Sequence, residues 1–220
     1  IDPVRLAELF RSQAGGILPY VFQPTRLSQY LVMFGPFIFI LAFFIAGAAI
    51  RATGGRLPVG ETLRAWAWIA GLSAAAFLLV LLLSLAVIRR SGLESSPFIQ
   101  QWLNGMTLSE GFGQVLLARI GNPWLFLLLS ALLALIVTTL LRSLGARGLV
   151  PPPAAEDAPP ARFPDEPATM FALLAAFVGL ALTLVVEFFY LRDNFGMRMN
   201  TIFKFYYQGW VMMACASGYG

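Results

Sequence analysis

The sequence predicts an all-α, polytopic transmembrane protein with four complete spans and the start of a fifth. Three observations lead to this fold class. The 220 residues are 59% apolar with a mean hydropathy of +0.77, whereas soluble domains are about 45–50% apolar. Only 12% of the residues are charged, against about 25% in soluble domains. The apolar residues are gathered into runs of about 20, which is the length a helix needs to cross a bilayer.

The spans follow from these apolar runs, most of which are bounded by arginines. We expect helices over 31–50, 66–88, 123–141 and 169–190, and a fifth that begins near residue 201. They must be helices because lipid offers no partner for an open backbone and the runs show no period-2 alternation. Pro36 is expected to bend or delay the first helix. Because the chain begins at Ile1 and stops inside an apolar run, we expect it to be a piece of a longer protein.

Two helices carry small residues four apart, a spacing that allows close helix packing. They are Ala67, Gly71 and Ala75 in the second, and Ala172 and Ala176, beside Ala175 and Gly179, in the fourth. Tight packing within the chain is the main interpretation, and a dimer seam is the alternative.

The connections between spans predict interfacial helices and one linker. Amphipathic helices are expected at 3–13 and 96–120, lying on the membrane surface or, alternatively, roofing a site. Thr107 and Glu110 have the spacing of a capping box. The linker at 151–168 is expected to be extended and solvated, because seven prolines and four acids fall within 151–167. It separates a three-span part, 1–150, from a part at 169–220.

Composition also excludes several kinds of site. The chain has no His, which rules out His-ligated haem, zinc or chlorophyll and any Ser-His or Cys-His nucleophile within it. Fifteen basic residues against eleven acidic ones are spread thinly. This pattern indicates membrane-flanking charge and no nucleic-acid partner.

The segment 187–210 is the candidate site, because it places charges among aromatic residues at the end of the fourth span. Charges this close to a membrane core tend to pair or to line a polar cavity. The candidate phosphate-binding residues are Arg192, Arg198 and Lys204, since Arg makes bidentate phosphate contacts and Lys supplies a point charge. The candidate catalytic residues are Asp193 and Glu187, as general base, and Asp193 is also the candidate ligand of a divalent metal, Mg or Mn.

Helical spacing predicts which polar residues of the segment 187–210 lie on the same face of a helix. Tyr190 and Asn194 share the face of Glu187 if the helix persists to Gly196, and Asn200 is the expected N-cap of the fifth helix. On that helix a polar stripe consists of Thr201, Lys204 and Gln208. An aromatic stripe beside it consists of Phe203, Tyr207 and Trp210. Tyr190, Asn200 and Gln208 are therefore the supporting polar residues.

The residues alone leave three interpretations of this segment open. It is an interfacial hairpin whose cations snorkel and whose aromatics form a membrane belt. Alternatively, it is an anion site for phosphate or pyrophosphate, or a transport or proton path that uses Glu187.

The run EFFYLRDNFGMRMNTIFKFYYQGW at 187–210 resembles the signature of the YYY-domain membrane proteins of bacteria and archaea, which are longer polytopic proteins. That family is similar to the C-type membrane glycosyltransferases, which take sugars from polyprenyl-phosphate donors. The resemblance implies a prokaryotic cell-membrane protein whose basic cluster binds a lipid phosphate, and hence a glycosyltransferase-like enzyme using a polyprenyl-phosphate-linked sugar. The alternatives are an accessory subunit that assembles with other membrane subunits and, third, a transporter.

Overall fold

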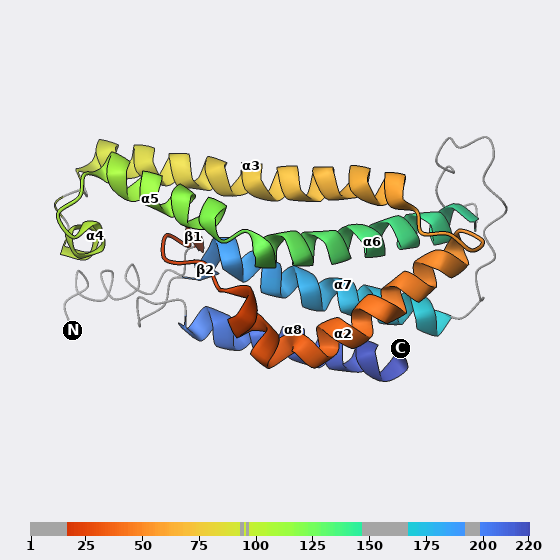
Figure 1. The fold of residues 1–220 in the computed structure, drawn as a ribbon. Helices are drawn as coiled ribbons and strands as arrows, with labels where there is room; N and C mark the ends of the chain where they lie inside the picture. Colours follow the sequence, from red (N-terminus) through yellow and green to blue (C-terminus); the bar gives the residue numbers. More distant parts are fainter. Residues whose placement is uncertain (1–16, 93–94, 96, 147–166, 192–198) are drawn as a thin grey trace, which may run out of the picture.

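The computed structural model describes residues 17–92, 95, 97–146, 167–191 and 199–220 (Figure 1). Five long helices dominate this part of the chain: α2 Leu27–Ala52, α3 Val59–Ser91, α6 Trp124–Ala146, α7 Pro167–Phe188 and α8 Met199–Tyr219. Among the described residues, four helices, α2, α3, α6 and α7, are long and apolar enough to cross a membrane. The predicted all-α fold with four complete spans is confirmed.

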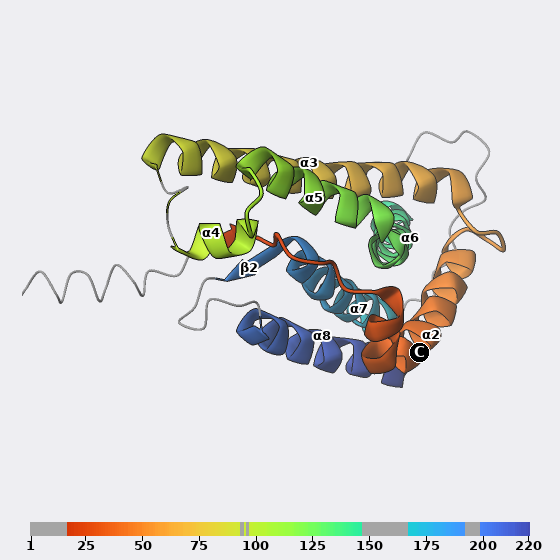
Figure 2. The same ribbon diagram turned by 60° about the vertical axis from the view of Figure 1, so that its left-hand side comes forward.

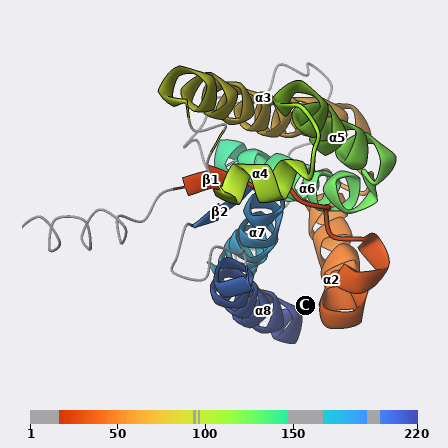
Figure 3. The same cartoon turned by 90° about the vertical axis from the view of Figure 1, so that its left-hand side faces the viewer.

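The helices form a row in which each packs on the next. α3 packs against α6, α6 against α7, and α7 against α8, while α2 lies against α6 and α8. Figure 3 looks along the bundle and shows α3 and α8 at opposite edges with α6 and α7 between them. The amino-terminal ends of α2, α6 and α8 and the carboxyl-terminal ends of α3 and α7 therefore lie at the same end of the bundle (Figure 1).

Three of the observed helices, α2, α3 and α6, are longer than the apolar runs that predicted them, whereas α7 has the predicted length and begins two residues earlier. α3 has 33 residues because the helix continues through polar residues on both sides of its apolar centre, among them Glu61 and Arg89. α2 begins at Leu27 and continues through Pro36. Of the two effects expected of Pro36, a delayed start of the helix was wrong, and a bend stays a prediction.

Two shorter helices, α4 Pro97–Leu103 and α5 Leu108–Gly121, occupy the predicted amphipathic region. The capping box is present: the Glu110 N–H donates to the Thr107 hydroxyl at 3.3 Å, and the Thr107 N–H donates to the Glu110 carboxylate at 2.8 Å. The Thr107 hydroxyl also donates to this carboxylate at 2.8 Å, and the two bonds from the Thr107 N–H and hydroxyl lower the pKa of Glu110. α5 runs along α3 (Figure 2) and buries Leu108, Phe112 and Val115, so this face lies on protein. The amphipathic helix predicted at 3–13 and the linker at 151–168 fall outside the described residues, apart from Pro167 and Ala168 at the start of α7.

A short antiparallel pair of strands, β1 Ile17–Pro19 and β2 Phe189–Leu191, was not predicted. Leu18 pairs with Tyr190, and the Tyr20 N–H donates to the Phe188 carbonyl at 2.7 Å. α7 therefore ends at Phe188, and Tyr190 lies in a strand. The expectation that Tyr190 continues the helical face of Glu187 was wrong.

α7 and α8 pack tightly against each other at two glycines, Gly179 and Gly209. A Cβ on Gly179 would lie 2.8 Å from Cγ of Met213 and 3.1 Å from the Gly209 carbonyl oxygen. The small residues predicted to pack in the fourth span, Ala172, Ala175, Ala176 and Gly179, are all buried. The matching prediction for the second span was wrong within this chain, because Ala67, Gly71 and Ala75 are exposed on α3.

Candidate functional site

Glu187 lies in the last turn of α7 and is 4% exposed. Its two carboxylate oxygens accept hydrogen bonds from two distant parts of the chain. The Thr25 hydroxyl donates to Oε1 at 2.6 Å, and the Thr25 N–H donates to Oε2 at 2.9 Å. The Tyr206 hydroxyl of α8 donates to Oε1 at 3.3 Å. One buried carboxylate thus joins the segment ahead of α2 to α7 and α8.

The strand pair explains how Thr25 reaches Glu187. Pairing of β1 with β2 carries the amino-terminal segment across the end of α7. Two further bonds attach the same segment to α5 and to the turn before α6: Arg119 donates to the Tyr20 carbonyl at 2.7 Å, and Asn122 donates to the Thr25 carbonyl at 3.4 Å. Thr25 is therefore fixed on both of its sides.

Arg119 also packs its guanidinium against two aromatic rings. The charge lies 4.3 Å from the ring centre of Phe77 and 5.2 Å from that of Phe188, within the range of cation–π attraction. Arg119 therefore connects α5, α3 and the end of α7 beside the strand pair.

A second polar contact lies one helical turn below Glu187. The hydroxyl groups of Tyr30 and Thr183 are 3.1 Å apart. The Tyr30 ring stacks on Phe34 at 4.6 Å and meets the Tyr206 ring edge-on at 6.3 Å. Polar groups from α2, α7 and α8 thus converge at this end of the bundle.

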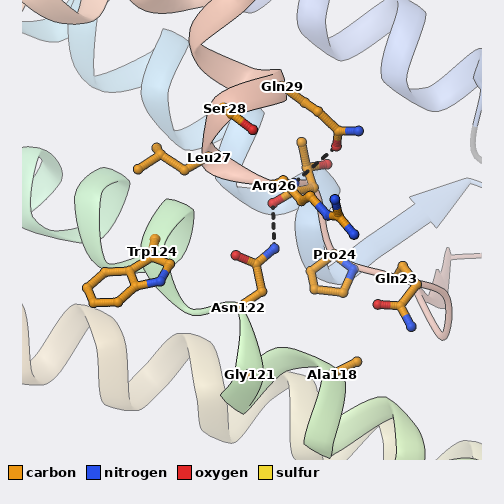
Figure 4. Close-up of a pocket in the computed structure, with 11 residues that line it drawn as sticks. Gln23, Pro24, Arg26, Leu27, Ser28, Gln29, Ala118, Gly121, Asn122 and Trp124 are labelled. Carbon is orange, nitrogen blue, oxygen red and sulfur yellow. Dashed lines mark hydrogen bonds between the residues drawn. The ribbon is translucent and has the colours of Figure 1, made fainter.

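Two cavities lie beside the hydrogen bonds that join Glu187 to Thr25 and Tyr206. A polar pocket of about 960 Å³ lies between the segment ahead of α2 and the α5–α6 turn (Figure 4). Thr25 is part of its wall. An apolar groove of about 510 Å³ lies between α2 and α8, and Tyr206 is part of its wall. The predicted aromatic stripe, Phe203, Tyr207 and Trp210, lines this groove. Thr25 and Tyr206, one from each cavity, donate to the same carboxylate.

A comparison with protein-family models identifies the family of the chain. Residues 6–213 match the family described as "Uncharacterized membrane protein (DUF2298)". The chain belongs to this family. No curated protein and no solved structure matches it significantly. Membership in DUF2298, together with the four apolar helices, shows an integral membrane protein.

The structure places the predicted site residues of this DUF2298 member in different surroundings. Glu187 and Tyr190 are buried, whereas Lys204 and Gln208 are exposed on α8. Asn200 is the second residue of α8, so it does not precede the helix as an N-cap, as we had expected. Instead, the Thr201 hydroxyl accepts from the Leu191 N–H at 3.0 Å and ties α8 to β2.

The remaining predicted residues, Arg192, Asp193 and Arg198, lie outside the described residues. They belong to the seven residues that connect β2 to α8. Within the described residues, no group of three or more acidic or Cys side chains gathers where it could hold a metal ion.

Sequence reasoning missed Thr25, Arg119 and Tyr206 as partners of the site. Thr25 and Glu187 are 162 positions apart, and no local pattern connects them. Tyr206 was inside the signature, but the expected stripes on α8 did not include it. A search for hydroxyl groups able to satisfy a buried Glu187 would have found Tyr206 as a candidate.

Proposed function

We propose that this protein is a membrane enzyme that uses a polyprenyl-phosphate-linked sugar, with its site at the end of the bundle where α7 ends and α8 begins. The supporting observation is that Glu187 holds the wall of a polar pocket through Thr25 and the wall of an apolar groove through Tyr206. A lipid-linked sugar has a polar head and a long apolar tail. It needs a polar and an apolar surface side by side at a membrane boundary.

In this proposal the basic residues hold the phosphate. Lys204 is exposed on α8, the helix that also lines the apolar groove. Arg192 and Arg198 belong to the connection that leads into the same helix. A lipid whose tail occupies the groove would carry its phosphate at the end of the groove near Met199, where α8 begins and the cations favour it.

The two acids take different roles. Both oxygens of Glu187 already accept hydrogen bonds, so Glu187 acts as a positioning residue that keeps the two walls together. Asp193 is the candidate base that takes the proton of the acceptor hydroxyl as the sugar leaves the lipid phosphate. A divalent metal, Mg or Mn, would neutralise phosphate charge, with Asp193 as its proposed ligand.

Binding of a polyprenyl-phosphate sugar to the purified full chain tests the proposal. We expect Arg192→Ala, Arg198→Lys and Lys204→Ala each to weaken binding by about ten- to hundredfold, because each loses a charged hydrogen bond or the bidentate fork. Arg56→Ala is the matched control, since Arg56 is exposed in the turn between α2 and α3 at the other end of the bundle. Absence of lipid binding by wild type, or an equal loss in the control, would overturn the proposal.

An accessory subunit of a larger membrane complex is the second candidate function. The exposure of α3 supports this candidate, because only 11% of the most apolar stretch of this helix is buried inside the chain. A helix with so much free apolar surface can lie in lipid or against another subunit. The same experiment separates the two candidates, since an accessory subunit binds no sugar-bearing lipid.

A further inference from the structure

The polar pocket beside Thr25 has the position of a headgroup site. Its wall is formed by residues 23–29, where α2 begins, and by the α5–α6 turn up to Trp124, where α6 begins. Both helices are apolar enough to span a membrane, so their first residues lie at the membrane boundary. The volume of about 960 Å³ lies within the range of roughly 300–1,000 Å³ for small-molecule sites.

The pocket offers hydrogen-bonding groups for which the described part of the chain provides no partner. Three side chains that line it, those of Gln23, Ser28 and Trp124, make no hydrogen bond to another described residue. The carboxamide oxygen of Gln29 accepts from the Arg26 N–H at 3.2 Å, which leaves its NH₂ group. The NH₂ group of Asn122 donates to the Thr25 carbonyl at 3.4 Å, which leaves its oxygen. Figure 4 shows these side chains gathered around the pocket.

These groups indicate which chemical class of ligand the pocket can bind. Amides and hydroxyls both donate and accept, as the hydroxyls of a sugar require. The indole of Trp124 is 62% exposed and offers an apolar face to the C–H side of a sugar ring. Arg26 is the one cation among the described residues that line the pocket, and no carboxylate is among them. A neutral sugar attached to a phosphate fits this lining, whereas a metal ion does not.

We propose that this pocket binds the sugar of a glycosyl phosphate. The inference deepens the proposed function and rests on it for the lipid carrier. Thr25 links the two sites: its carbonyl accepts from Asn122 in the pocket, and its N–H and hydroxyl donate to Glu187. The carboxylate that belongs to the signature segment therefore holds the wall of the sugar site in place.

The test compares three probes on the purified full chain in lipid nanodiscs: a prenyl phosphate, the same prenyl phosphate carrying a sugar, and a soluble glycosyl phosphate. We expect wild type to bind the sugar-bearing lipid about tenfold more tightly than the bare lipid. Gln23→Leu and Trp124→Leu should remove this difference and leave affinity for the bare prenyl phosphate unchanged. Gln114→Leu and Trp68→Leu are the matched controls, because both residues are exposed on α5 and α3 outside the pocket.

The outcomes separate the pocket from the lipid site. Equal wild-type affinity for the two lipids overturns the sugar pocket and leaves the proposed function standing. Binding of the soluble glycosyl phosphate alone, lost in Gln23→Leu and Trp124→Leu, supports the pocket and overturns the lipid carrier. No binding of any probe overturns both. If the two control variants lose the sugar preference as well, the preference does not come from this pocket and the inference fails.

Discussion

Two helix pairs in this bundle are held together in different ways. α7 and α8 pack closely at Gly179 and Gly209, because a Cβ on either glycine would lie only 3.1 or 3.2 Å from the carbonyl oxygen of the other. α3 and α6 are joined by side chains at separate points: Arg142 forms a bidentate ion pair with Glu61, and the Trp66 indole donates to the Ser130 hydroxyl at 2.9 Å. Gly71 on α3 has nothing within 4 Å of where its Cβ would be.

The comparison shows that spacing of small residues does not decide which helices pack closely. Both α3 and α7 carry small residues four apart, yet only α7 meets a partner helix with a glycine at the crossing point. The carboxylates differ in the same way. Glu187 is buried and held by neutral donors of Thr25 and Tyr206, whereas Glu61 has 27% of its side chain exposed and pairs with a guanidinium. We therefore expect substitutions in the α7–α8 pair to lower stability more than substitutions in the α3–α6 pair.

The largest effect is expected from Glu187→Ala. The substitution removes the acceptor of three hydrogen bonds, which at about 0.6–1 kcal/mol each in a membrane protein amounts to roughly 2–3 kcal/mol of stability. Glu187→Gln keeps one acceptor oxygen and should lose about half as much. Thermal unfolding in one detergent measures both. A loss of stability no greater than that of Glu61→Ala would show that the buried carboxylate of Glu187 does not stabilise the protein more than the partly exposed one of Glu61.

A second contrast is expected between Gly179→Val and Gly71→Val. The new side chain on α7 would overlap Met213 and the Gly209 carbonyl, and overpacking of this kind costs about 2 kcal/mol. The same substitution on α3 meets open space and should change stability by less than about 0.5 kcal/mol. The unfolding midpoints of the two variants, compared with wild type, give the answer. Equal losses would mean that α3 has a partner helix at Gly71 in the membrane.

The parts of the fold that could be predicted are those fixed by local composition. Apolar runs located the long helices because lipid forces a helix wherever about 20 apolar residues follow one another, and Thr107 with Glu110 located the start of α5. The β1–β2 pair could not be predicted, since three-residue strands carry too little pattern and pair across the whole chain. Without that pairing, Tyr190 was placed on the wrong kind of element.

The candidate site was predictable only in part for the same reason. Glu187 stood out because a carboxylate inside an apolar run needs partners. Its partner Thr25 lies in an unremarkable segment 162 positions away, and only the folded chain brings them together. Lys204 was grouped with Glu187 by sequence distance, but it is exposed whereas Glu187 is buried.

The ion pair of α3 and α6 is expected to matter less than Glu187. Glu61→Gln leaves Arg142, whose side chain is 16% exposed, within reach of water, so the loss should be about 1 kcal/mol. Because partly exposed charges are screened by salt, the difference between wild type and variant should shrink between low salt and 1 M salt. The difference for Glu187→Gln should change little. Unfolding midpoints at the two salt concentrations test this, and a salt-independent Glu61 effect would contradict it.

The smallest effect is expected from Trp66→Phe, the other contact between α3 and α6. The substitution removes one hydrogen bond to Ser130 and keeps an aromatic ring at the position. Ser130 keeps a partner, because its hydroxyl also donates to the Phe126 carbonyl at 2.6 Å. The cost is therefore one interhelical bond, about 0.6 kcal/mol. Ser130→Ala in the same background tests the assignment: if the two residues act through this bond, the double variant should lose no more than the larger single loss. Additive losses would show that Trp66 and Ser130 stabilise the pair independently, and that α3 and α6 are held by packing as α7 and α8 are.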